Sequence, residues 1–280
     1  MGDLGVDTAV RGGDGVYEAT LSREWEIWGP MGGYVVATAL RAAGAHTRFD
    51  RPASVVAHYL GVAAFGPVTL TTTTLRAAKK AESVRVSVTQ GDRAVVEALV
   101  WAVADDLPAL THDVTPMPGD AGAPLDHPTV EERLAAAGRD GDDTYPFWRN
   151  FESRPLAWVD DWEAREPGAP EWQTWLRFLP DPDTGDPWID AARLAILLDV
   201  GSWPAVVRRH VDPGGLYAPS IDLACHFHRF RPRSAYLFAQ GTSPSGADGL
   251  VTSHQSVWAD DGTFLASGIS QLLCRPVSSA

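Results

Sequence analysis

Hydrophobic and polar positions along the chain follow the same order twice. A helical spacing of apolar residues over 32–43 precedes a strand-like alternation that opens at Pro52. In the second half, Asp199 and Pro219 lie 167 residues after Gly32 and Pro52, respectively, and Pro219 again opens an alternating run. A helix followed by several long strands, written twice at a constant offset, predicts a duplicated α+β unit.

The pattern predicts one set of elements for each half. In the first half we expect a strand over 16–21, a helix over 32–43 ended by Gly44, and strands over 54–62, 68–76, 83–89 and 94–104. In the second half we expect a strand over 172–179, a helix over 189–198, and strands over 221–230, 235–240, 250–259 and 263–275. The predicted domains are therefore 1–106 and 168–280, joined by a linker over 107–167.

The turn at Asp199 is expected to lead into the second central helix. Ser202 is a candidate N-cap for that helix, because Pro204 then falls in the first turn, where its missing N–H costs little. The amides of Val200 and Gly201 would then lie at a helix start, unpaired and favourable to negative charge. A plain helix-capping role is the alternative interpretation of Asp199.

Composition narrows the class of protein. The chain has 280 residues, of which 45% are hydrophobic and 21% charged, with a formal charge of −13. That charge argues against nucleic-acid binding, which depends on clustered basic residues. The N-terminus lacks a basic stretch followed by an apolar one, and no run reaches the ~18 apolar residues of a membrane span. A cytoplasmic protein without a membrane partner is expected, with Cys225 and Cys274 as buried free thiols in strands.

Several short motifs, in their order and spacing, resemble those of the acyl-CoA thioesterase II family. They are Trp28-Gly29-Pro30-Met31-Gly32-Gly33, the Gln90-Gly91 turn, Asp199 with Pro204, Pro219-Ser220-Ile221-Asp222 leading to His226-Phe227-His228-Arg229, and Asp261 to Ser267. The resemblance covers nearly the whole chain outside the linker. It implies a double hotdog, an α+β fold in which two curved antiparallel sheets each wrap a central helix.

The resemblance also implies an activity and a site. The family hydrolyses acyl thioesters with an Asp, a Thr or Ser, and a Gln that activate a water. Asp199 and Ser220 match the first two positions. An ungapped alignment from Asp261-Gly262 places Ser270 at the position of the family's Gln, and Gln271 one residue later. Either a bulge turns Gln271 inward, or Ser270 takes the place of the Gln. We take Asp199, Ser220 and Gln271 as the catalytic set, with acyl-CoA as substrate and no cofactor or metal.

Other polar residues are candidates for binding. Gly201 would let a carbonyl approach closely. Arg229 and Arg231 could bind the nucleotide end of coenzyme A, since arginine suits phosphate contacts, although a solvated basic strand edge explains them equally well. His226 and His228 share a strand face, but no spacing enforces a third metal ligand.

Two other functions stay open. A hotdog hydratase or dehydratase would need an Asp and a His placed for proton transfer at carbon, and Asp222 with His226 is a loose substitute. A noncatalytic acyl-thioester-binding protein would keep the pocket without turnover. A homo-oligomer such as a dimer is compatible with each of these functions.

Overall fold

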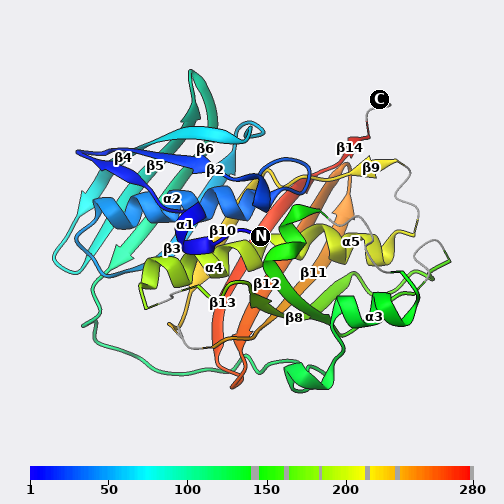
Figure 1. Ribbon diagram of the computed structural model, residues 1–280. Helices are drawn as coiled ribbons and strands as arrows, with labels where there is room; N and C mark the ends of the chain where they lie inside the picture. The colour runs from blue at the N-terminus through cyan, green and yellow to red at the C-terminus, as the bar shows by residue number, and fades with distance from the viewer. Residues whose placement is uncertain (140–144, 161–163, 183–184, 212–214, 231–233, 278–280) are drawn as a thin grey trace.

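Twelve strands form one continuous antiparallel sheet in the computed structural model, and two helices lie side by side against it (Figure 1). The structure describes residues 1–280 except 140–144, 161–163, 183–184, 212–214, 231–233 and 278–280. The strand order is β1-β2-β4-β5-β6-β3-β10-β13-β12-β11-β8-β7. The two halves of this order mirror each other around the β3–β10 junction, where His58 pairs with Asp222 and Ser54 with His226. The predicted double hotdog is confirmed.

The helices and strands have the following bounds. The helices are α1 (Leu4–Asp7), α2 (Gly32–His46), α3 (Val130–Ala136), α4 (Pro187–Val200) and α5 (Ser202–Arg209), with 3-10 turns η1 (Arg23–Trp25), η2 (Pro124–Asp126) and η3 (Pro146–Asn150). The first half contributes β1 (Arg11–Gly13), β2 (Val16–Leu21), β3 (Arg51–Tyr59), β4 (Gly66–Ala77), β5 (Ala81–Gln90) and β6 (Arg93–Val103). The second contributes β7 (Phe151–Pro155), β8 (Glu171–Phe178), β9 (Leu216–Tyr217), β10 (Asp222–Phe227), β11 (Leu237–Ala247), β12 (Leu250–Ala259), β13 (Phe264–Leu273) and β14 (Arg275–Pro276).

Helices α2 and α4 run antiparallel and in close contact. A Cβ added to Gly33, at the start of α2, would lie 2.8 Å from the carbonyl oxygen of Ala195 near the end of α4. At the other end of the pair, a Cβ on Gly44 would lie 2.6 Å from the indole of Trp188. The absent side chains let the two helices approach, and this brings the start of α2 to the end of α4.

The second central helix begins earlier than predicted. Asp186 caps α4 by accepting from the backbone N–H of Trp188, and Pro187 occupies the first helical position. The helix then continues through Asp199 and ends at Val200, with Gly201 as its C-cap. Asp199 therefore lies in the last turn of the central helix, and the prediction that it precedes that helix is wrong. The Ser202 cap is also wrong, because Gly201 takes the cap position of α5 and no side chain caps it.

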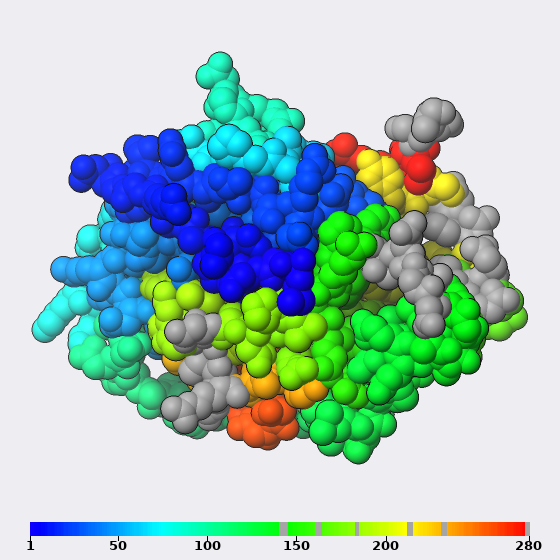
Figure 2. All heavy atoms as spheres, viewed as in Figure 1, coloured from blue at the N-terminus to red at the C-terminus, as the bar shows by residue number. Residues whose placement is uncertain are grey.

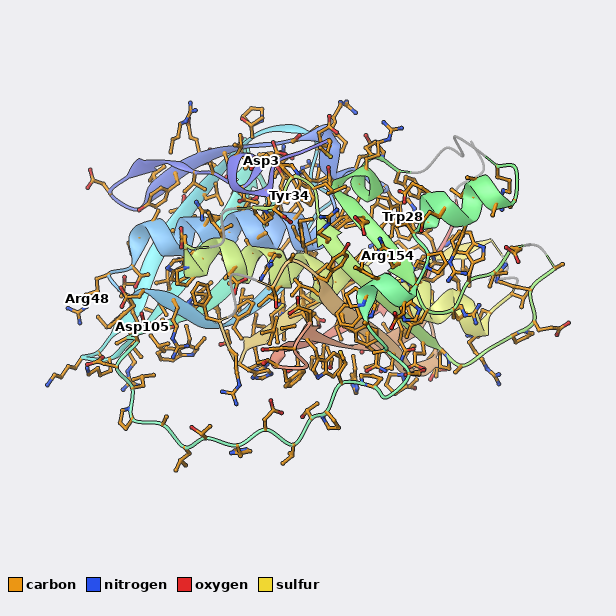
Figure 3. The ribbon with its side chains drawn as sticks, turned by 60° about the horizontal axis from the view of Figure 1, so that its bottom comes forward. Asp3, Trp28, Tyr34, Arg48, Asp105 and Arg154 are labelled. Atoms are coloured by element: carbon orange, nitrogen blue, oxygen red, sulfur yellow. The ribbon has the colours of Figure 1, made fainter. Side chains whose placement is uncertain are left out.

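The segment predicted as a linker contributes to the second half of the sheet. Its β7 pairs with β8 as the edge strand, with Phe151 opposite Phe178. Upstream, the chain after Asp105 runs extended and exposed along the molecule (Figure 3). It then covers the outer sheet face, where the indole N–H groups of Trp258 and Trp175 donate to the carbonyls of Thr115 and Ala121.

The N-terminal residues link the two halves on the face that Figure 2 shows, where they lie against the yellow-green residues of α4. The backbone N–H of Gly2 donates to the side-chain oxygen of Asn150 at 2.7 Å, and the amide of Asn150 donates to the carbonyl of Glu24. One buried amide thereby joins η1 and η3.

The cysteine predictions differ in outcome. Cys225 is a buried free thiol on β10, as predicted, whereas Cys274 is a free thiol that follows β13 and is only half-buried. Among the described residues, no helix is both long and apolar enough to cross a membrane.

Candidate active site

The carboxylate of Asp199 accepts hydrogen bonds from both halves of the chain. Its Oδ2 accepts from the backbone N–H of Gly33 at 2.7 Å, and its Oδ1 accepts from the hydroxyl of Ser220 at 3.0 Å. The structure thus brings together two of the three residues in the predicted catalytic set. Both carboxylate oxygens keep a further lone pair that can accept from a ligand or a water.

The start of α2 explains the first of these bonds. Met31 precedes this helix, and its sulfur accepts from the N–H of Tyr34 in place of a hydroxyl or carboxylate cap. The N–H of Gly33 is one of the amides that a helix start leaves without an intrahelical partner, and such amides favour an anion. The prediction that Val200 and Gly201 supply unpaired amides is wrong, because they lie at the end of α4, where the N–H of Gly201 bonds to the carbonyl of Asp199.

Ser220 reaches Asp199 because the chain before β10 is held against β13. Leu272 forms an isolated bridge with Ser220, and the N–H of Leu273 donates to the carbonyl of Pro219 at 3.0 Å. The N–H of Ile221 also donates to the carbonyl of Gln271. Backbone bonds on both sides therefore fix the position of the hydroxyl.

Burial raises the pKa of Asp199 above its usual value, and the bonds from Gly33 and Ser220 partly offset that rise. The position at the C-terminal end of α4 acts in the same direction as burial, since a helix C-terminus disfavours a negative charge. A carboxylate with a raised pKa accepts a proton more readily than an exposed one, which is the property a general base requires.

Tyr59, the last residue of β3, was missed by the sequence analysis. Its hydroxyl is buried and has no hydrogen-bond partner among the described residues. The position where a Cβ on Gly32 would stand lies 2.9 Å from this hydroxyl and 2.8 Å from Oδ2 of Asp199. The sequence does not mark Tyr59 as a site residue, because it is simply the last residue of an alternating strand. The carboxylate near its hydroxyl, Asp199, comes from the second half of the chain.

A buried glutamine near Gly201 was also missed. Gln255 on β12 is 2% exposed, and its amide nitrogen lies within hydrogen-bond distance of the hydroxyls of Ser253 and Ser202. A Cβ on Gly201 would lie 2.6 Å from Oε1 of Gln255 and 2.7 Å from the ring of Trp172. Gly201 therefore allows close packing at the junction of α4 and α5, next to a buried amide.

Gln271 does not face the helices, because the bulge that would turn it inward is not formed at this point of β13. β13 pairs regularly with β12 at this point, with Ser270 opposite Ser253 and Gln271 opposite Thr252. Ser270 is 2% exposed and its hydroxyl donates to the carbonyl of Asp222. The Gln271 side chain accepts from the hydroxyl of Thr252 on the other face. Since side chains alternate along a regular strand, Ser270 takes the inward position.

The remaining candidates lie away from Asp199. Arg229 borders a small crevice with Pro187 and Asp190, at the opposite end of α4, and Arg231 lies outside the described residues. His226 is exposed at the far end of β10 from Asp222, about 13 Å along the strand. In the part of the chain that the structure describes, no group of three or more His, Cys, Asp or Glu could hold a metal ion.

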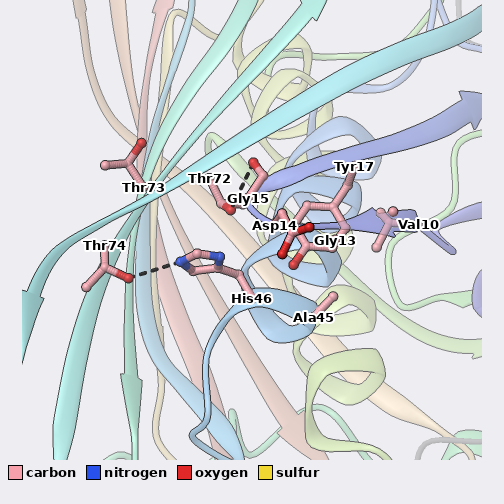
Figure 4. A pocket seen from close by; sticks show the side chains of 11 residues that line it. Val10, Gly13, Asp14, Gly15, Tyr17, Ala45, His46, Thr72, Thr73 and Thr74 are labelled. Carbon is pink, nitrogen blue, oxygen red and sulfur yellow. Dashed lines mark hydrogen bonds between the residues drawn. The ribbon is translucent and has the colours of Figure 1, made fainter.

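A large surface hollow of about 710 Å³ is distinct from the Asp199 site (Figure 4). It is lined by the β1–β2 turn, the end of α2 and the middle of β4. His46 lines it and bonds to Thr74 at 3.0 Å. The hollow lies at the C-terminal end of α2, about 20 Å from Gly33 along the helix.

The fold and the Asp199–Ser220 pair define a double-hotdog protein with a half-buried carboxylate at the junction of its two helices. Comparison with known families agrees: residues 21–103 match the model of the acyl-CoA thioesterase N-terminal domain, and residues 124–273 match that of the C-terminal domain. The chain belongs to the acyl-CoA thioesterase family. No curated protein matches it.

Solved structures with the same fold are distant in sequence. A conserved hot dog protein of unknown function from Alicyclobacillus acidocaldarius has a TM-score of 0.82 and 18% identity, covering 99% of this chain and 98% of that chain. The acyl-CoA thioesterase II TesB2 from Mycobacterium marinum has a TM-score of 0.75 and 19% identity, covering 98% of both chains. The dehydratase domain of PpsC from Mycobacterium tuberculosis is less similar, with a TM-score of 0.52 and 14% identity over 98% of this chain and 100% of that chain.

Proposed function

We propose that this protein hydrolyses acyl-CoA thioesters to a free acid and coenzyme A, with Asp199 as the general base. The observation that carries the proposal is the half-buried carboxylate held by Gly33 and Ser220 in a chain of the acyl-CoA thioesterase family. A general base must be fixed within reach of a water and must accept its proton. The two bonds fix Asp199, and its raised pKa favours proton acceptance.

The reaction needs one water and no cofactor. The water donates a hydrogen bond to Asp199, and its oxygen attacks the carbonyl carbon of the thioester while Asp199 takes the proton. The carbonyl electron pair moves to oxygen, and the C–S bond breaks when that pair returns. The departing thiolate of coenzyme A takes the proton from Asp199, which restores the carboxylate. Ser220 holds Asp199 during both proton transfers.

Exposed apolar side chains that are close in sequence to the site residues support an acyl substrate. Leu60 and Val62 follow Tyr59 and are 55% and 69% exposed. Trp28 is 46% exposed and makes edge contacts with Trp203 of α5 and with Tyr217, three residues before Ser220. Exposed apolar side chains of this kind are typical of a surface that receives an apolar ligand.

The hydratase or dehydratase alternative has weaker support. Asp222 accepts from the backbone N–H of Gln271 at 2.8 Å, which is a structural role at the start of β10. His226 is exposed and lies four residues after Asp222 on the same face of β10, with Ala224 between them. It is therefore out of reach of Asp222. An acid–base pair for proton transfer at carbon is therefore not assembled from these two residues.

A panel of acyl-CoA substrates of different chain length tests the proposal. We expect release of free thiol, detected with a thiol-reactive dye, together with the carboxylic acid. A change in enoyl absorbance without thiol release would support the hydratase alternative. Tight binding of the panel without any turnover would support a noncatalytic acyl-binding protein. A cytoplasmic location, a role in lipid metabolism and a homodimer stay predictions.

A further inference from the structure

Tyr59 carries a hydroxyl that the folded chain leaves without a partner. Its Oη is buried and has no hydrogen-bond partner among the described residues. Buried hydroxyls are almost always paired, because an unpaired one carries the full cost of its lost hydration. The backbone of this residue is well fixed, since its N–H donates to the carbonyl of Ile221 at 3.0 Å. A fixed, buried and unpaired donor indicates that a bound ligand supplies the acceptor.

The Tyr59 hydroxyl lies next to Gly32, which has no side chain. Oη of Tyr59 and Oδ2 of Asp199 both lie within 3 Å of the position that a Cβ on Gly32 would take. The two oxygens are therefore less than about 6 Å apart, a separation that bound oxygen atoms can bridge by hydrogen bonds. Because Gly32 has no side chain, the space between the phenol and the carboxylate stays open.

The phenol is a donor at neutral pH. Burial raises the pKa of Tyr59 well above its usual value, and the nearby charge of Asp199 raises it further. A protonated phenol has one O–H to donate, and the acceptor it faces must come from outside the chain.

We propose that the Tyr59 hydroxyl binds the carbonyl oxygen of the acyl thioester and stabilises the oxyanion that forms when water attacks. This assignment rests on the proposed hydrolysis. The attacking water needs acceptors, which Asp199 and Ser220 provide, whereas the carbonyl oxygen needs a donor. The N–H of Gly33 is already bonded to Asp199. Among the described side chains, Tyr59 carries a buried hydroxyl beside the carboxylate that is still unpaired.

The step balances without a further reagent. The carbonyl electron pair moves onto oxygen as the new C–O bond forms, and the hydrogen bond from Tyr59 shortens as the charge grows. Tyr59 keeps its proton throughout, while Asp199 carries the proton of the water. When the C–S bond breaks, the carbonyl re-forms and the bond from Tyr59 relaxes.

Tyr59→Phe removes this hydroxyl alone. We expect kcat to fall by about 10²-fold, the usual loss for one oxyanion donor, and KM to rise by up to about tenfold, because the same hydrogen bond holds the carbonyl of the bound substrate. Thermal stability should be unchanged or higher, because the hydroxyl has no partner in the unliganded fold. Tyr236→Phe is the matched control: its hydroxyl donates to Glu152 at 2.6 Å, so its loss should lower stability and leave kcat near the wild-type value. A Tyr59→Phe enzyme with wild-type kcat would overturn the proposal.

Two unreactive acyl-CoA analogues separate this role from hydrolysis itself. In one, a methylene replaces the sulfur, which leaves a ketone; in the other, a methylene replaces the carbonyl, which leaves a thioether. We expect Tyr59→Phe to weaken binding of the ketone about tenfold and to leave binding of the thioether unchanged, as for the loss of a single hydrogen bond. Equal affinities of mutant and wild type for the ketone would refute the Tyr59 assignment. If the wild type hydrolyses no acyl-CoA, the proposed function fails, and this pair of analogues still decides whether Tyr59 binds a carbonyl.

Discussion

The backbone N–H of Gly33 donates to the carboxylate of Asp199 at 2.7 Å, although the two residues are 166 positions apart. Gly33 lies in the first turn of the central helix of the first half, and Asp199 lies in the last turn of that of the second. The antiparallel packing of α2 and α4 creates this contact. The site therefore depends on both halves, and neither half contains it alone.

Replacing Gly33 with alanine tests this dependence. A Cβ there would lie 2.8 Å from the carbonyl oxygen of Ala195 and 3.0 Å from Cβ of Asp199. We expect Gly33→Ala to lower the free energy of unfolding by about 1–3 kcal/mol, as for other overpacked sites. Because the shift displaces Asp199, kcat should also fall, by about 10²-fold for a displacement near 1 Å.

Gly44→Ala is the control for that variant. Its Cβ would meet the indole of Trp188 at 2.6 Å, at the other end of the same helix pair. Denaturant unfolding and thiol-release assays should show a comparable loss of stability for both variants and a loss of kcat for Gly33→Ala alone. Equal kcat values for the two variants would contradict a catalytic role for the start of α2.

Ser220 is expected to act through Asp199. Ser220→Ala removes a hydrogen bond to a charged group, which is worth about 1.5–3 kcal/mol, so kcat/KM should fall by about tenfold or more. Ser220→Thr keeps the hydroxyl and should retain most of the activity. Steady-state kinetics of the two variants decide the matter: if alanine and threonine have the same effect, the hydroxyl is not what the site requires.

The pH dependence of kcat/KM should report Asp199. The ionised carboxylate is the base, so activity should be full above its pKa and lost as the pH falls through it. Because burial raises this pKa, the loss should begin at a higher pH than the ordinary value of 3.8 would give. Ser220→Ala removes a bond that lowers the pKa, and its profile should move to still higher pH. A wild-type profile that stays flat down to pH 4 would contradict the assignment.

Ser270→Ala should lower kcat more than Gln271→Ala, because the strand register turns Ser270 inward and Gln271 outward. Gln271→Ala changes an outward side chain, and its kcat should stay within about twofold of wild type, as for most surface substitutions. Ser270→Ala removes the inward hydroxyl that bonds the carbonyl of Asp222, near the start of β10, and should cost about 1 kcal/mol of stability and lower kcat. A larger loss of kcat in Gln271→Ala would show that the side chain turns inward when substrate binds.

The alternation of apolar and polar residues predicted most of the fold. The strand expected over 250–259 and the strand over 16–21 have the observed bounds of β12 and β2, because one face of each is buried and the pattern of period two is clear. The β7 strand was missed, since Phe151–Pro155 is a short edge strand without alternation.

The site was only partly predictable. Asp199 and Ser220 stood out through the family resemblance and its spacing. Tyr59 beside Asp199 and Gln255 beside Gly201 lie on strands distant in the sequence, so no local pattern marks them. The one-residue ambiguity between Ser270 and Gln271 was decided by regular pairing with β12, which the sequence does not reveal.

Asp199→Asn tests the central claim most directly. The substitution is nearly isosteric, and the amide cannot take a proton from water. With the fold verified by circular dichroism and thermal unfolding, thiol release from the best acyl-CoA substrate should fall by about 10²–10⁴-fold, the usual contribution of a positioned general base. Hydrolysis at the wild-type rate by the folded variant would contradict the account and leave Asp199 as a cap for α2.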